Sequence, residues 1–548
     1  MRLLAFLFST LQSSKTATVV TSPFWNNLKL VNKLHDPPPV EILKEIQKNP
    51  WKGALEPVDP AGIPLHEAKV IEGEIPTDLK GVLCRNGAGR IRIGDTKYGG
   101  WFDGDGFVTC LSIDGASQKA TYAGKYVETK RFKSQQRIQQ KQGNVPVGEA
   151  GVWTKRGEGK WWQNLIQMPT NPSNTNVLFF PNPKDEKTPI MYALAEGGDP
   201  VQMDPKNLKT IGPTALKSKS GERVKSFFSA HTTEDPVTGE VFNHGLVIGP
   251  QIKLNLMKLD GFGNLLKQHA TDLPFTVMVH DNVISQRFFV ALLPPWLTTM
   301  KSIFETIFGG NSLAKQFSWN PQGDTETTAM IFSKETLKCV VKVALPLLST
   351  YHLIDAFEDD NDPNILTLRI LVHDPNPSAR AISEAACEDI YKATNIPLCS
   401  LMEYKVDVKA ARLLSGRKII PAAAPCELPD VNAKWGYRKR YVYTNSRENG
   451  VECYTNSIQK IDLELETCSD VISFGEGVYA GGPLFVPKEN AHDEDDGYIF
   501  TQLYRSKDHG SDVCILDAKT MQKIALLRLD ARVPFQFHGT WYGGFTQS

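Results

Sequence analysis

Four histidines lie far apart in this 548-residue chain, each within a short phrase of its own. They are His231 in Ser-Ala-His-Thr, His280 in Val-His-Asp-Asn, His352 in Tyr-His-Leu-Ile and His538 in Phe-His-Gly-Thr. Four neutral imidazoles can hold a ferrous ion without adding charge, which leaves the ion a dication with open positions for dioxygen. The four residues therefore predict an Fe(II) centre that performs oxygen chemistry.

The spacing of these histidines favours a ligand set collected from different parts of the fold. The intervals between them run from tens of residues to well over a hundred, which excludes a local zinc motif such as His-x-x-x-His. His280 and His352 each follow an apolar, strand-like run, and His538 follows Val-Pro-Phe-Gln-Phe. Residues that end the inner strands of different propeller blades converge on one axis. The spacing thus fits a radial arrangement of ligands.

The other histidines lie outside these phrases, and we interpret them as structural. They are His35, His66, His244, His269, His373, His492 and His509. Of these, His244 and His373 sit in strand-like contexts.

Short runs of β-branched and aromatic residues, each closed by a turn cluster, recur between residues 65 and 545. Examples are residues 288–293 before Pro294-Pro295 and residues 440–444 before Asn445. Many short strands imply a sandwich, a barrel or a propeller, and over this length a propeller accommodates the strands most easily. No linker-like tract interrupts the pattern. We therefore predict an all-β fold, with one propeller domain over residues 51–548 after an N-terminal extension, residues 1–50.

Two segments break the strand rhythm. Apolar residues in 296–308 recur with helical spacing, which predicts an amphipathic helix. Such a helix either packs on the domain or makes a peripheral membrane contact where an apolar substrate is dissolved. Residues 377–395 are predicted to form another helical insertion.

Composition excludes some partners. The 61 basic and 61 acidic residues cancel, and no stripe of Lys and Arg interleaved with aromatics is present, so nucleic acid is not an expected partner. The nine cysteines are scattered without a Cys-x-x-Cys pair, which indicates thiols in a reduced compartment.

The first 35 residues contain no Asp or Glu and are rich in Ser and Thr, as in an organelle transit peptide. The apolar run at residues 3–8 could instead begin a secretory signal, and a disordered tail is a third reading. The expected location is a plastid or another organelle if the segment is a transit peptide, and the cytoplasm otherwise. No run of about 18 apolar residues exists, so a transmembrane protein is not expected.

Several further phrases, in this order along the chain, resemble the carotenoid cleavage oxygenase family, which also includes stilbene-cleaving enzymes and retinoid isomerases. They are residues 70–76, residues 83–87, Trp-Phe-Asp-Gly-Asp-Gly at 101–106, residues 194–198, residues 235–240, Glu-Leu-Pro at 427–429, Pro-Leu-Phe-Val-Pro at 483–487, and Glu-Asp-Asp-Gly-Tyr at 494–498. The resemblance runs from about residue 55 to about residue 545. It implies a seven-bladed β-propeller with a helical and loop cap over the metal-bearing face. It also implies oxidative cleavage, by Fe(II) and dioxygen, of a C=C bond in a carotenoid or apocarotenoid to give two carbonyl products.

The resemblance further implies carboxylates that support the ligands. Glu196 would support His280 and Glu427 would support His352, although both could be ordinary strand-end carboxylates. The family carries a third glutamate immediately before Pro483, where this chain has Gly482. His538 then lacks its expected partner unless Glu476, a backbone carbonyl or water replaces it. Loss of such a partner typically costs ~10–100-fold in metal affinity or activity.

An apolar tunnel would select the double bond that reaches the metal. Its candidate wall residues are Phe102, Phe275, Trp296, Phe308, Phe537 and Trp541, although a simple core role is the favoured interpretation of each one taken alone. Thr175 resembles a family residue that crowds an open coordination position. Asp103 and Asp105 alternate with glycine, and we interpret them as part of a structural turn rather than as metal ligands.

Three alternative functions stay open. Tyr98 and Lys130 approximate the phenol-binding residues of the stilbene-cleaving relatives. Non-oxidative isomerisation of a retinoid ester is a second alternative. A non-catalytic propeller with a degraded metal site, which carries an apocarotenoid, is the third, and Gly482 is the one feature that favours it.

Overall fold

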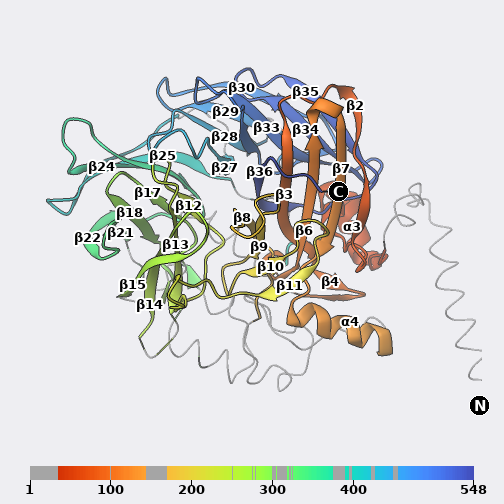
Figure 1. The fold of residues 1–548 in the computed structure, drawn as a ribbon, viewed down its shortest axis with the longest axis horizontal. Helices are drawn as coiled ribbons and strands as arrows, with labels where there is room; N and C mark the ends of the chain where they lie inside the picture. The colour runs from red at the N-terminus through yellow and green to blue at the C-terminus, as the bar shows by residue number, and fades with distance from the viewer. Residues whose placement is uncertain are drawn as a thin grey trace, which may run out of the picture.

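The computed structural model describes residues 35–547, with gaps at residues 99, 143–169, 248, 250, 274–275, 278, 299–303, 305–317, 320–322, 324, 374–388, 394–395, 397, 421–425 and 448–453. Within this part, the chain is a seven-bladed β-propeller built from antiparallel sheets (Figure 1). The predicted all-β fold is thereby confirmed.

Blade 1 combines early strands with the last strand of the chain, and blade 2 follows blade 1 in the sequence. Blade 1 consists of β1 (Ile63–Glu67), β7 (Lys119–Tyr126), β6 (Asp105–Asp114), β3 (Lys80–Arg90) and β36 (Gln536–Gly543). Blade 2 consists of β11 (Thr210–Pro213), β10 (Val201–Met203), β9 (Ile190–Leu194) and β8 (Asn176–Phe180).

The next four blades are four-stranded and follow one another in sequence. Blade 3 consists of β12 (Thr233–Glu234), β13 (Val241–Val247), β14 (Lys253–Leu259) and β15 (Leu265–Asp272), and blade 4 of β17 (Asn282–Ile284), β18 (Phe288–Leu293), β21 (Glu326–Ser333) and β22 (Cys339–Pro346). Blade 5 consists of β23 (Leu353–Glu358), β24 (Ile365–Val372), β25 (Ser400–Asp407) and β26 (Arg412–Lys418), and blade 6 of β27 (Cys426–Asp430), β28 (Tyr441–Ser446), β29 (Ser457–Asp462) and β30 (Thr467–Ser473).

Blade 7 and the small elements complete the fold. Blade 7 consists of β31 (Val478–Ala480), β32 (Leu484–Pro487), β33 (Gly497–Arg505), β34 (Gly510–Asp517), β35 (Lys523–Leu529) and β2 (Lys69–Gly73). Two small sheets are formed by β4 (Arg92–Ile93) with β5 (Thr96–Lys97), and by β16 (Thr276–Val277), β19 (Trp296–Thr298) and β20 (Ser318–Trp319). The helical elements with described bounds are α3 (Val40–Lys48), α4 (Lys130–Gln142) and the short 3-10 turns η1 (Pro50–Leu55), η2 (Trp101–Asp103) and η3 (Gly115–Ser117).

The ring is closed by strands from both ends of the chain. The last strand, β36, pairs with β3 in blade 1, and the early strand β2 pairs with β35 in blade 7. The orange N-terminal strands therefore lie beside the blue C-terminal strands in Figure 1. Arg85 of β3 adds a side-chain link, because its Nη2 donates to the carbonyl of Gly482 in blade 7 at 2.6 Å. Closure thus fixes the position of β36, which carries His538.

Apolar side chains fill the spaces between neighbouring blades. In β24, Leu368 and Ile370 belong to a cluster shared with blade 4, whereas Leu371 belongs to a cluster shared with blade 6. All three are fully buried. Alternate residues of a strand point to opposite faces, so a strand covered on both faces is apolar throughout. This explains the near-continuous apolar runs in the sequence.

The prediction of a helix over residues 296–308 is wrong for its first residues. Trp296–Thr298 form β19, which pairs with β16 and β20, and Trp296 is buried with its ring centroid 5.3 Å from that of Trp319. Strand pairing has overridden the helical spacing there. Most of the remainder lies outside the described residues, although Phe304 is helical and 63% exposed. No described helix is long and apolar enough to cross a bilayer.

Residues 35–50, in the expected extension, are folded in part. Helix α3 packs its apolar side chains into a cluster that includes Ile390, Tyr391 and Phe537. Lys52 Nζ donates to the carbonyl of Tyr391 at 2.5 Å, and Tyr391 Oη donates to Glu56 at 2.9 Å. Of the insertion predicted at 377–395, residues 377–388 and 394–395 lie outside the described part, and residues 390–392 form a turn. This turn and the N-terminal segment together cover Phe537, next to His538.

The prediction that the cysteines are free thiols is wrong for one pair. Cys84 of β3 and Cys110 of β6 form a disulfide, with their Cα atoms 4.2 Å apart. They are direct cross-strand partners, and the narrow pairs of an antiparallel ladder bring their side chains together. The described free thiols are Cys339, Cys399, Cys426, Cys468 and Cys514.

Asp105 of the Trp-Phe-Asp-Gly-Asp-Gly phrase is a structural residue. Its carboxylate is fully enclosed, accepts from Arg90 Nε at 2.9 Å and Arg131 Nε at 3.1 Å, and accepts from Tyr98 Oη at 2.8 Å. Although burial opposes ionisation, the two guanidinium groups hold the pKa of Asp105 below its usual value. Gly106 beside it has no room for a side chain, because a Cβ would lie 2.1 Å from the Ser173 carbonyl oxygen.

Replacing Asp105 with Asn tests this role. Asp105→Asn leaves two buried cations without a counter-charge, so the free energy of unfolding should fall by about 3–5 kcal/mol. Asp114→Asn is the matched control on the same strand, because Asp114 pairs with Lys80 at the surface and its loss should matter far less. Urea denaturation measures both. Equal, small effects of the two variants would contradict the assignment.

Candidate metal centre

The four histidines of the sequence analysis meet at one end of the inner strands. His231, His280 and His352 come just before the inner strands β12, β17 and β23, and His538 lies on the inner strand β36. One ring nitrogen from each lies within 4.8 Å of the others. His352 Nε2 and His538 Nε2 are 3.3 Å apart. Blades 1, 3, 4 and 5 therefore each supply one imidazole to a common point.

The electrostatics of this point suit a metal cation. Burial, and then the neighbouring imidazoles, lower the pKa values of His231, His280 and His538 well below the usual value, so these rings are neutral. His231 Nε2 is buried and has no hydrogen-bond partner among the described residues. A buried polar atom without a partner is costly, and a metal ion bound by the four rings would supply that partner. The donor set thus fits a metal ion.

Glu427 of β27 is hydrogen-bonded to one of these rings. His352 Nδ1 donates to Glu427 Oε2 at 2.6 Å, and the backbone N–H of Leu428 donates to the same oxygen at 2.6 Å. Burial works against both charges, but each partner stabilises the other, so the pKa of Glu427 is well below its usual value and that of His352 is raised. A proton fixed on Nδ1 leaves Nε2 free to face the common point.

Glu196 lies near two of the rings without a short contact to either. It follows β9 and its Oε1 is 3.6 Å from His280 Nδ1 and 3.9 Å from His231 Nε2. Ser229 Oγ donates to its other oxygen at 3.3 Å. Burial raises the pKa of Glu196 to about 8. The structure therefore places Glu196 beside His280, but at a longer distance than the one between Glu427 and His352.

Asp281 is a site residue that the sequence analysis did not single out. Its Oδ1 is 3.6 Å from His231 Nδ1, and its Oδ2 accepts from the backbone N–H of Leu353 at 2.8 Å. Burial raises the pKa of Asp281 to about 6. The available signal was its place directly after His280, which puts it at the same strand end. It joins the ends of blades 3, 4 and 5.

His538 is positioned by its backbone. Its N–H donates to the carbonyl of Thr175 at 3.1 Å, and no described carboxylate forms an ion pair with its ring. Glu476, the suggested substitute, is exposed in the turn before β31. Gly482 lies between β31 and β32, where a Cβ would be 2.9 Å from Leu428 Cβ. Leu428 therefore closes the space through which a glutamate at 482 would have to pass.

Aromatic residues line one side of the histidine cluster. Phe102 contacts Phe537 and Tyr351 with centroid distances of 5.6 and 6.2 Å, and Tyr351 contacts His280 at 5.0 Å. Of the other proposed wall residues, Trp541 packs on Phe500 between blades 1 and 7, and Trp296 packs on Trp319. Phe275 and Phe308 lie outside the described residues. Among the wall candidates, Phe102 is thus connected to His280 through Tyr351, and Phe537 packs on Phe102.

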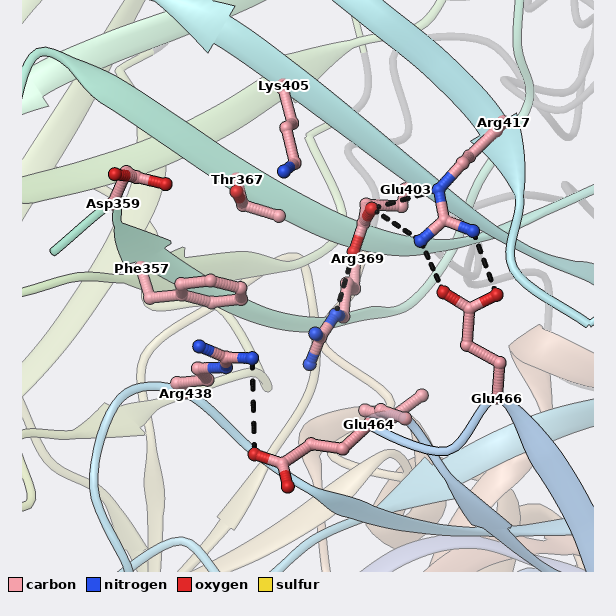
Figure 2. Close-up of a pocket in the computed structure, with 11 residues that line it drawn as sticks. Phe357, Asp359, Thr367, Arg369, Glu403, Lys405, Arg417, Arg438, Glu464 and Glu466 are labelled. Carbon is pink, nitrogen blue, oxygen red and sulfur yellow. Dashed lines mark hydrogen bonds and ion pairs between the residues drawn. The ribbon is translucent and has the colours of Figure 1, made fainter. Parts of the chain in front are cut away.

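Figure 2 shows a different concave region, a pocket of about 460 Å³ at the other end of β23 from His352. Ion pairs cross it, as between Arg417 and Glu466. Its basic residues are Arg369, Lys405, Arg417 and Arg438, and its acidic residues are Asp359, Glu403, Glu464 and Glu466. The charges balance and the lining is polar, which does not suit an apolar polyene.

Fold and site together define a β-propeller protein with a four-histidine centre on its axis. The family model described as retinal pigment epithelial membrane protein matches residues 56–543, so the chain belongs to this family.

Relatives and solved structures agree with that membership. The apocarotenoid-15,15'-oxygenase of Synechocystis sp. is 27% identical over 482 residues, covering 86% of this chain and 92% of the relative. A chloroplastic 9-cis-epoxycarotenoid dioxygenase of Arabidopsis thaliana is 25% identical, covering 97% of this chain and 90% of the relative. A crystal structure of cobalt-substituted Synechocystis apocarotenoid oxygenase superposes with a TM-score of 0.77 at 25% identity, over 90% of this chain and 98% of that one.

The contact between Gly482 and Leu428 gives a stability prediction. Gly482→Ala should lower the free energy of unfolding by about 1–3 kcal/mol, because its Cβ overlaps Leu428. Gly481→Ala is the control, since a Cβ there meets nothing nearer than 3.5 Å. Adding Leu428→Ala to Gly482→Ala should cost less than the sum of the two single changes. Additive effects in urea denaturation would show that Leu428 does not close this space.

Proposed function

We propose that this protein is a non-haem Fe(II)-dependent dioxygenase that cleaves a C=C bond of a carotenoid or apocarotenoid into two carbonyl products. The observation that carries the proposal is the convergence of His231, His280, His352 and His538. These four residues are the proposed metal ligands, and Glu196 and Glu427 are their proposed supports. The relatives named as apocarotenoid and carotenoid oxygenases support the substrate class.

The residues of this chain divide the work in a simple way. Iron, when bound, supplies the activation of dioxygen, because neutral ligands leave its charge and its open positions available. Glu427 keeps the proton of His352 on Nδ1 and so aims Nε2 at the metal position. The rings of Phe102 and Phe537 provide an apolar surface that excludes water and favours a polyene. The aromatic faces also stabilise positive charge that develops on the substrate.

The alternative functions have less support. Tyr98 Oη donates to Asp105 within the Arg90 and Arg131 cluster, and Lys130 is exposed at the start of α4, so neither residue is placed to hold a stilbene phenol. A non-catalytic carrier would be favoured by Gly482, but the four imidazoles still meet. Non-oxidative isomerisation of a retinoid ester can be distinguished from oxidative cleavage, because only cleavage incorporates label from ¹⁸O₂ into the products.

Peripheral membrane contact through residues 296–308 and organelle targeting by residues 1–35 are further parts of the proposal. They follow from the exposed Phe304 and from the absence of acidic residues in the N-terminal segment. Residues 1–34 lie outside the described part of the chain.

A metal-ligand variant tests the centre. His352→Ala should abolish both the retention of iron and the cleavage reaction. The iron would then lose the imidazole ligand that is oriented by a short hydrogen bond to a carboxylate. His492→Ala is the matched control, since His492 is exposed and remote in sequence from the four phrases. Iron content after gel filtration and product formation are measured for both. Normal iron content and turnover in His352→Ala would contradict the ligand assignment.

A substrate panel tests the reaction. Iron-loaded protein should convert carotenoids or apocarotenals to two carbonyl products that carry label from ¹⁸O₂, and should leave resveratrol unchanged. Mass spectrometry of the products reads out both. Cleavage of resveratrol alone, an unlabelled isomerised ester, or iron binding with no oxygen consumption would each replace the proposal with one of the three alternatives.

A further inference from the structure

Two buried side chains with no place in the proposed reaction lie against the second oxygen of Glu427. Glu427 Oε2 accepts from His352, whereas its Oε1 is 3.3 Å from Cys399 Sγ and 3.2 Å from His373 Nε2. His373 is 0% exposed and Cys399 1% exposed. The three groups offer donor atoms within 4.8 Å of one another.

Blade topology explains why these residues meet. Strand β23 begins at Leu353, β24 ends at Val372 and β25 begins at Ser400. The three strands are antiparallel neighbours, so the residues just beyond these ends lie on the same edge of blade 5. Those residues include His352, His373 and Cys399.

Blade 6 is joined to this edge of blade 5 by a pair of backbone hydrogen bonds. The N–H of Cys399 donates to the carbonyl of Cys426 at 2.8 Å, and the N–H of Cys426 donates to the carbonyl of Cys399 at 3.0 Å. Glu427 follows Cys426 directly. The bridge between blades 5 and 6 therefore delivers the carboxylate to the blade edge that holds its three neighbours.

Cys399 donates a hydrogen bond to the ionised carboxylate of Glu427, and His373 faces the same carboxylate oxygen at 3.2 Å. Burial, and then Glu427, raise the pKa of Cys399 well above its usual value, so the thiol keeps its proton and donates it. Both ring nitrogens of His373 are buried without a hydrogen bond to any described residue, and Nε2 makes a 3.2 Å contact with Glu427 Oε1. The ring of Tyr351 packs edge-on against His373 with a centroid distance of 5.9 Å and fixes its plane. His373 Nε2 is thus held facing Glu427 Oε1.

We propose that Cys399 and His373 are positioning residues for the metal centre. They contact Oε1 of Glu427 and so keep its other oxygen, Oε2, in the hydrogen bond with Nδ1 of His352. That hydrogen bond in turn keeps Nε2 of His352 directed at the metal position. This inference rests on the proposed function. Without these contacts only Oε2 of Glu427 is held, by the Leu428 N–H and His352, so the orientation of the carboxylate and of the imidazole is less restricted.

Cobalt titration of the metal-free protein tests the inference without requiring turnover. Cys399→Ala and His373→Phe should each weaken Co(II) binding by roughly 3–10-fold and shift the visible absorption of the bound ion. Cys399→Ser and His373→Gln keep a donor and should recover most of the affinity. Cys514→Ala, which removes a buried thiol from blade 7, is the control and should leave affinity and spectrum unchanged.

A second background shows whether the residues act through Glu427. In Glu427→Gln the further changes Cys399→Ala and His373→Phe should have little additional effect on affinity, since the carboxylate they hold is gone. Undiminished effects in that background, or wild-type affinity in the single variants, would overturn the proposal. A second equivalent of Co(II) or Zn²⁺ that is lost in Cys399→Ala would also overturn it, by identifying a separate metal site at this cluster.

The failure of this inference is distinguishable from that of the proposed function. Wild-type protein that binds one Co(II) but cleaves no polyene defeats the proposed reaction and leaves the positioning role measurable. Wild-type protein that binds no Co(II) defeats both.

Discussion

The structure depends on the closure of the propeller ring by the final strand. β36 pairs with β3, and the same strand carries His538 to the axis where three other blades present their histidines. The step that completes the fold therefore also completes the ligand set. A chain that loses β36 loses the ring closure and the fourth imidazole together, which ties metal binding to global folding.

The polar groups around the four rings are distributed unevenly. His352 is held at 2.6 Å by Glu427, which Cys399 and His373 contact in turn. Glu196 stands 3.6 Å from His280, and no described carboxylate forms an ion pair with the ring of His538, whose backbone N–H donates to Thr175. An oriented ligand on one side and a looser one on the other give the centre a defined asymmetry. The apolar ring of Phe102 contacts Phe537 and Tyr351, and Tyr351 contacts His280.

The features that could be predicted from the sequence are those that short stretches of the chain specify by themselves. Alternating apolar strands and turn residues indicate the β fold, and the short phrases around His231, His280, His352 and His538 mark the strand ends that face the axis. Contacts that depend on how strands and blades align could not be predicted. The Cys84–Cys110 disulfide depends on the register in which β3 pairs with β6. The contact between Gly482 and Leu428 depends on how blades 6 and 7 pack against each other. The contact of His373 with Glu427 could not be predicted either, because Glu427 comes from the next blade.

X-ray absorption spectroscopy of the iron-loaded protein tests the central claim most directly, because it counts the atoms bound to the metal. The account predicts one iron per chain with four imidazole nitrogens in its first shell, and one fewer in each of the four single His→Ala variants that retains metal. A shell dominated by carboxylate oxygen or sulfur, or an unchanged shell after replacement of any of the four histidines, would contradict it.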